Sequence, residues 1–133
     1  MDMLQYQKEA QNTKSEVFYE KLLTTGQRES IPTTPATDIF HAALGLATEA
    51  GELLDPFKKG LFYGKTLDLV NLDEEIGDHL WYIAIYAEAR GKTIPELAAM
   101  NNRKLKQRYP EKFTQEAALN RDLFAERQVL EGE

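Results

Sequence analysis

The stretch from residue 67 to residue 90 has an apolar stripe when it is drawn as a helix, and its C-terminal half is apolar around most of its circumference. Leucine, isoleucine and alanine recur at helical spacing along one face, and Trp81, Ala84 and Ile85 extend the apolar surface around its C-terminal half. Such a helix needs cover on all sides. A chain of this length buries roughly two-thirds of its surface and would struggle to surround it. We therefore expect a helical dimer, ahead of a central helix in a monomeric bundle.

Further segments of the chain also have helical patterns, and none shows the alternation of a strand or an internal repeat. The second helix begins near Thr37 or Asp38 and runs to about Asp55, where Pro56 should end or kink it. The sequence thus predicts an all-α fold in a single domain of residues 1–133 with a core of 36–113. The other expected segments are helices at 2–25, 92–109 and 114–129, a loop at 27–37 and a connector at 58–66.

Composition narrows the classes of function. The net charge of −6 argues against a protein that binds nucleic acid polymers through overall charge. The chain has no cysteine, which excludes disulfides and thiolate zinc sites. Its longest apolar run, residues 80–87, is too short to span a membrane, and its polar N-terminus is not a signal peptide. We expect a cytoplasmic protein, bacterial or in the host cytoplasm if phage-encoded, with no membrane partner.

Two pairs of acidic residues stand out because the members of each pair are three residues apart, on one helical face. Glu49 and Glu52 belong to the second helix, and Glu75 and Asp78 to the third. A short connector predicts that these helices form an antiparallel α-hairpin. In a symmetric hairpin Glu49 is level with Asp78 and Glu52 with Glu75. Glycines at 45 and 51 would let the helices approach closely.

Four carboxylates in a partly buried place cannot all stay ionised unless cations neutralise them. The ligands are all oxygen, which favours Mg²⁺, with Mn²⁺ as a substitute, over zinc or copper. The simplest alternative is that each pair forms a solvated face. A di-iron bundle would need Glu-x-x-His on two helices, which this chain lacks. His79 is expected to pack at an interface, and His41 either touches substrate or is structural.

The only concentrated basic stretch is residues 101–110, NNRKLKQRYP. Lys104 and Arg108 share a helix face, with Asn101 one turn earlier. Such a run is usually a solvated face. Beside a carboxylate metal centre it also suits a clamp for phosphates, because arginine presents a fork and lysine a point charge to phosphate oxygens.

The segments GLATEAGEL, LDEEIGDHLWYIA and NNRKLKQRYP together resemble the MazG-like nucleoside triphosphate pyrophosphohydrolases, over residues 40–113. The family signature E-x-x-E, spacer, E-x-x-D matches Glu49, Glu52, Glu75 and Asp78, and FYGK and RYPEKF are similar to its compact bacterial and phage members. One departure concerns Asn71, where some members carry a basic residue. Lys58, Lys59 or Lys65 are candidates to compensate.

The resemblance implies a helical bundle, a dimer or a dimer of dimers, that cleaves (d)NTP between the α- and β-phosphates with Mg²⁺. By motif match the four carboxylates hold metal, and Asn101, Lys104 and Arg108 grip phosphates. Glu49 or Glu52 is expected to act on the attacking water as the catalytic base. The alternatives are a non-catalytic helical dimer that binds nucleotides or a partner protein, and a diphosphatase specific for dUTP or dCTP.

Overall fold

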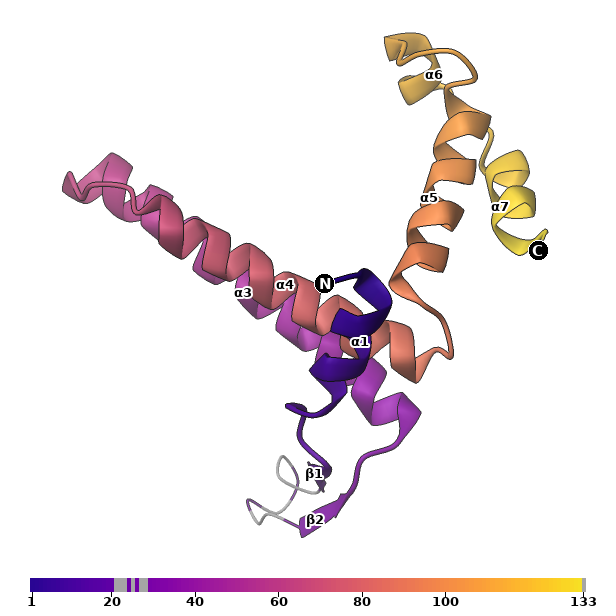
Figure 1. Ribbon diagram of the computed structural model, residues 1–133. Helices are drawn as coiled ribbons and strands as arrows, with labels where there is room; N and C mark the ends of the chain where they lie inside the picture. The colour runs from indigo at the N-terminus through magenta and orange to yellow at the C-terminus, as the bar shows by residue number, and fades with distance from the viewer. Residues whose placement is uncertain (21–23, 25, 27–28, 133) are drawn as a thin grey trace. The chain divides into compact units, whose positions relative to one another are not determined.

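The computed structural model describes residues 1–20, 24, 26 and 29–132, which form two compact units, Met1–Thr93 and Ile94–Glu133 (Figure 1). Helices predominate in both units. The first holds α1 (Met3–Gln11), β1 (Val17–Glu20), β2 (Glu29–Pro32), α3 (Pro35–Tyr63) and α4 (Leu69–Ala89). The second holds α5 (Ile94–Arg108), α6 (Gln115–Leu119) and α7 (Leu123–Glu131).

Helix α3 is longer than the sequence pattern predicted, at both ends. Thr34 caps it by accepting a hydrogen bond from the Thr37 backbone N–H, and the Thr37 hydroxyl accepts one from the Thr34 N–H in return. The expected start at Thr37 or Asp38 is therefore too late. The expected end at Asp55 is wrong too, because the helix continues through Pro56 to Tyr63. Gly64, with a φ of 65°, ends it in the left-handed conformation that glycine adopts without strain.

Helix α4 agrees with the predicted segment within two residues at each end. The Asp68 carboxylate caps it by accepting hydrogen bonds from the backbone N–H groups of Val70 and Asn71. Helices α3 and α4 pack side by side as an antiparallel hairpin, as predicted (Figure 1). The Tyr82 ring packs directly against the backbone at Gly45. A Cβ atom on residue 45 would lie only 2.1 Å from Cε1 of Tyr82, so a side chain has no room at this position. Gly51, by contrast, faces open space, so the expected close approach at Gly51 is wrong.

The N-terminal segment differs most from the prediction. Helix α1 ends at Gln11, and β1 pairs antiparallel with β2, Phe18 opposite Ile31. The helix expected over 2–25 is thus confirmed over α1 but wrong at β1, and the loop expected over 27–37 is wrong at β2 and at the start of α3. Residues 21–23, 25, 27 and 28 lie outside the described part. Valine and aromatic residues at 17–19 suit a pleated strand better than a helix. Helix α1 packs on α4, where the buried Gln7 amide donates to the Lys92 carbonyl at 2.9 Å.

The other elements of the first unit leave part of the apolar surface of α4 exposed. Ala84, Ile85 and Ala87 of α4 are buried, but Ile76 is 50% exposed and Val70 is 77% exposed. No helix in the described part of the chain is long and apolar enough to cross a membrane.

In the second unit, helix α5 lies beside α7 (Figure 1). Helix α5 confirms the helix expected over 92–109. The single helix expected over 114–129 is instead two helices, because Thr114 caps α6 and Asp122 caps α7, each through its side chain.

Candidate metal centre

Three of the four predicted carboxylates converge in the structure. Glu49 and Glu52 of α3 and Glu75 of α4 each offer one carboxylate oxygen, and these oxygens lie within 4.8 Å of one another. Glu75 is buried, Glu49 is partly buried and Glu52 is exposed. The i, i+3 spacing on α3 and the antiparallel register of α4 together produce this cluster.

Asp78, one turn further along α4, is exposed and does not belong to the group within 4.8 Å. Its charge nevertheless acts on the cluster. Burial raises the pKa of Glu49 above its usual value, and the negative charges of Glu52, Asp78 and Glu75 raise it further. The fourth predicted ligand thus borders the three-carboxylate cluster.

Two oxygens of the cluster are buried acceptors with no partner. Among the described residues, Glu49 Oε2 and Glu75 Oε2 have no hydrogen-bond donor. A buried acceptor without a partner is costly, and carboxylates that crowd together repel. A hard divalent cation would relieve both costs, and an all-oxygen ligand set suits Mg²⁺ or Mn²⁺. The residues present therefore fit a divalent cation.

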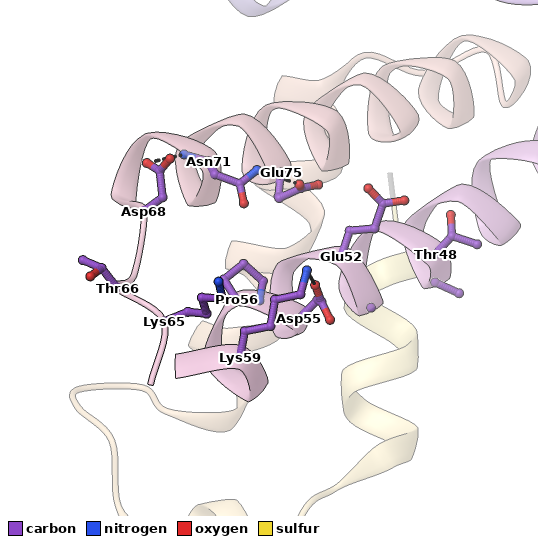
Figure 2. A pocket seen from close by; sticks show the side chains of 12 residues that line it. Thr48, Glu52, Asp55, Pro56, Lys59, Lys65, Thr66, Asp68, Asn71 and Glu75 are labelled. Atoms are coloured by element: carbon purple, nitrogen blue, oxygen red, sulfur yellow. Dashed lines mark hydrogen bonds and ion pairs between the residues drawn. The ribbon is translucent and has the colours of Figure 1, made fainter. Parts of the chain in front are cut away.

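The other oxygen of Glu75 is held by an amide. Asn71 Nδ2 donates to Glu75 Oε1 at 3.1 Å, one turn away on the same helix (Figure 2). The Asn71 backbone is itself held by the Asp68 cap. Asn71 thereby holds one oxygen of Glu75, while the other, Oε2, has no donor among the described residues. The sequence showed Asn71 only as an amide at a position where some similar proteins carry a basic residue. Its contact with Glu75 was not predicted, because spacing alone does not show which partner an amide binds.

An aromatic cluster lies next to the carboxylates. The Tyr82 ring meets His41 and Trp81 edge to face, with centroids 5.6 and 4.9 Å apart respectively. Burial, and then the negative charges of the nearby carboxylates, raise the pKa of the Tyr82 hydroxyl. The His41 ring also packs edge to face against Trp81, with centroids 6.1 Å apart. His79 Nδ1 lies 2.8 Å from the Glu75 carbonyl of its own helix.

A cleft of about 710 Å³ opens beside the cluster, between α3, α4 and their connector (Figure 2). Glu52 and Glu75 line one part of it. Lys59 of α3 and Lys65 of the connector line another part, together with Thr66. The cleft therefore combines carboxylates that suit a cation with ammonium groups that suit an anion.

Residues 41–113 match the MazG nucleotide pyrophosphohydrolase domain. The chain belongs to the MazG family. No curated protein and no solved structure matches it. The MazG match covers all four predicted carboxylates and both lysines of the cleft, and it confirms the family resemblance seen in the sequence.

The predicted phosphate-binding residues of this MazG domain lie on α5, in the second unit. Asn101 is exposed and Lys104 is partly buried. Arg108 is already engaged, since its Nε and Nη2 donate to Glu126 Oε1 and Oε2 at 2.7 and 2.8 Å. Arg121 Nη2 donates to the same Glu126 at 2.6 Å. This pairing was not predicted from the sequence, because Glu126 lies in a weakly patterned C-terminal segment.

Proposed function

We propose that this MazG protein is a Mg²⁺-dependent (d)NTP pyrophosphohydrolase that cleaves between the α- and β-phosphates to give (d)NMP and pyrophosphate. The observation that carries the proposal is the pair of buried, partnerless oxygens of Glu49 and Glu75. They lie in a carboxylate cluster on a cleft that also has cationic lining. A metal-chelated polyphosphate has the charges that such a cleft accommodates.

Glu49, Glu52, Glu75 and Asp78 would hold the metal. When bound, divalent cations neutralise phosphoryl charge and lower the pKa of water at the reaction centre. The attacking water forms a bond to the α-phosphorus, and the bond from that phosphorus to the α,β-bridging oxygen breaks. Glu52 or Glu49 accepts the water proton as general base, and pyrophosphate leaves with the electron pair of the broken bond.

Asn101, Lys104 and Arg108 remain proposed phosphate contacts from α5. For Arg108 this requires that phosphate oxygens replace the Glu126 carboxylate, which already presents two oxygens to the same guanidinium fork. Lys104 needs no such exchange, because no ion pair of Lys104 is found among the described residues.

We also propose that the whole chain is one functional domain that assembles as a dimer or a dimer of dimers. The MazG match spans both compact units, which supports one domain. Large apolar side chains remain exposed on the α3–α4 hairpin, including Leu54 at 65% and Leu61 at 79%. A second copy of the chain would bury them.

The test of the reaction is incubation with each common (d)NTP and Mg²⁺ in ¹⁸O-labelled water. We expect pyrophosphate release and, by mass spectrometry, label in the nucleoside monophosphate, because water attacks the α-phosphorus. Label in released orthophosphate would contradict the cleavage position. No release from any nucleotide above a no-enzyme control would favour the non-catalytic binding protein, and turnover of dUTP or dCTP alone would indicate a specialised enzyme.

Glu52→Gln should reduce turnover by at least about 100-fold, the contribution typical of a general base. The fold should survive, because the substitution removes one charge from a repulsive cluster. Mg²⁺ at about 100 times its Kd should stabilise the wild type by about 2.7 kcal/mol, and the variant clearly less, measured by thermal unfolding. Glu74→Gln is the matched control, since Glu74 is exposed on the same helix as Glu75 but outside the carboxylate cluster. Near-normal turnover by Glu52→Gln would refute the assignment.

A further inference from the structure

The two lysines that line the cleft differ in what they already bind. Lys59 forms an ion pair with Asp55, one turn earlier on α3 (Figure 2). Lys58 Nζ lies 3.2 Å from the same carboxylate. Hydrogen bonds from these two lysines lower the pKa of Asp55, which therefore stays ionised and neutralises them in part. Among the described residues, the Lys65 side chain has no hydrogen bond and no ion pair. Lys65 is thus a cation of the cleft that has no ion-pair partner in the described part of the chain.

The backbone, and not the side chain, holds Lys65 at the cleft. Gly64 reverses the chain with its φ of 65°. The Lys65 N–H then donates to the Lys59 carbonyl at 3.2 Å, which ties the connector to the last turns of α3. Gly60 leaves room for this fold-back, because a Cβ there would lie 3.3 Å from the Lys65 carbonyl oxygen. The main chain therefore fixes the position of a lysine whose ammonium group is left for a ligand.

The charges along the cleft indicate the kind of ligand. Glu52 and Glu75 suit a divalent cation, while the connector end presents Lys65 and the partly neutralised Lys59 (Figure 2). On α3, Glu52 and Lys59 are separated by two helical turns, about 10 Å along the axis. A polyphosphate fits this arrangement if a divalent cation binds it at the carboxylate end of the cleft and its remaining negatively charged oxygens face the lysines.

In the opposite direction along α3 lies a second pocket, of about 290 Å³. Its lining includes the aromatic and apolar side chains of Phe18, Phe40 and Leu44 together with His41 and polar residues such as Asp38. Leu44, Thr48 and Glu52 follow one another at intervals of four residues, so both pockets open on one face of the helix. A nucleotide along this face would have its nucleoside near the aromatic residues and its terminal phosphates near the connector.

We propose that Lys65 contacts the β- and γ-phosphates of the nucleoside triphosphate and, after cleavage, the leaving pyrophosphate. This inference rests on the proposed function and adds a phosphate contact within the first unit of the chain. Lys65 would then be the lysine that compensates for Asn71, a choice that the sequence left open among Lys58, Lys59 and Lys65.

Lys65→Met tests the proposal, with Lys58→Met as the matched control. Lys58 is exposed, loses the same charge and does not line the cleft. With Mg²⁺ present, we expect Lys65→Met to weaken binding of inorganic pyrophosphate about tenfold by calorimetry, the scale of one hydrogen bond to a charged group. The KM for the triphosphate should rise similarly, and Lys65→Arg should restore much of both. Binding of the nucleoside monophosphate and of Mg²⁺ alone should be unchanged.

The outcomes separate this inference from the proposed function. If the wild type releases pyrophosphate but Lys65→Met matches Lys58→Met in both pyrophosphate affinity and KM, the Lys65 assignment is wrong and the enzyme assignment stands. If Lys65→Met weakened binding of the monophosphate as much as binding of pyrophosphate, the assignment would also be wrong. The lost charge would then act on any anionic ligand and not on the β- and γ-phosphates in particular. If the wild type binds pyrophosphate through Lys65 yet hydrolyses no nucleotide, the phosphate contact stands and the proposed reaction fails.

Discussion

At the scale of single residues, the strongest electrostatic effect lies in the second unit. Glu126 is 3% exposed and accepts hydrogen bonds from two arginines, Arg108 and Arg121. These contacts hold the pKa of Glu126 far below its usual range, with Arg108 the larger cause and Arg121 the second. They also raise the pKa of Arg108. The basic motif on α5 thus has a structural partner, which any phosphate contact by Arg108 must displace.

The pH dependence of stability should report this pairing. A carboxyl group whose pKa is lower in the folded than in the unfolded chain stabilises the fold above its unfolded pKa, roughly 4.3, and loses that contribution as the pH falls. Glu126→Gln should therefore lower the Tm clearly at pH 7, and the difference from wild type should shrink below about pH 4. Circular dichroism melts at several pH values measure this.

The control for that series is Glu116→Gln, since Glu116 is exposed on α6. Its melting temperature should follow that of the wild type at every pH. A Glu126→Gln deficit that stays constant down to pH 3 would mean that packing, and not ionisation, accounts for the loss.

At the scale of elements, the α3–α4 hairpin depends on one close approach. The Tyr82 ring occupies the place of a side chain at Gly45, whereas Gly51, six residues later on the same helix, has no atom near its missing Cβ. The first glycine sets how closely α3 and α4 pack beside the carboxylates. The second has no packing role within the described chain and lines the cleft.

Alanine at these two glycines should have opposite effects on the free energy of unfolding. Gly45→Ala forces the Tyr82 ring out of its place and should destabilise by roughly 1–3 kcal/mol. Gly51→Ala should stabilise by roughly 0.5–1 kcal/mol, because alanine restricts the unfolded chain and has room in the fold. Urea denaturation of both variants measures this, and a stable Gly45→Ala would contradict the observed packing.

At the scale of the whole molecule, a single chain leaves much apolar surface in water. Exposed leucine, phenylalanine, valine and isoleucine side chains extend along both α3 and α4 of the hairpin. Burial of apolar surface contributes about 25 cal/mol per Å², so a second copy that covers these side chains would gain substantially. In the proposed assembly, a second copy of the chain would cover both this exposed surface and the apolar side chains of residues 67–90.

Light scattering coupled to size exclusion should give the mass of a dimer or tetramer. The double substitution Leu54→Glu and Leu61→Glu places charge on the exposed apolar side of α3 and should give monomers. Leu119→Glu, on α6, carries the same change at a site that is 75% exposed and should leave the mass unchanged. A monomeric wild type at micromolar concentration would refute the assembly.

Local periodicity allowed the sequence by itself to determine much of the α3–α4 hairpin. Helical spacing depends on neighbours within a turn, so it predicted the antiparallel hairpin and placed Glu49, Glu52 and Glu75 on facing sides. It failed for residues 12–20, where pairing with β2 selects a strand, and at Pro56, where the helix continues despite a missing backbone donor.

The partners of the site residues depend on contacts between segments that lie far apart in the sequence. Glu126 meets Arg108 across 18 residues of sequence, and Lys65 reaches the cleft because Gly60 and Gly64 fold the connector back on α3. Asn71 leaves one oxygen of Glu75 without a donor. Spacing along a chain shows which charges share a face. Which of these charges is already neutralised, and which is left for a ligand, depends on contacts between segments that only the folded chain brings together.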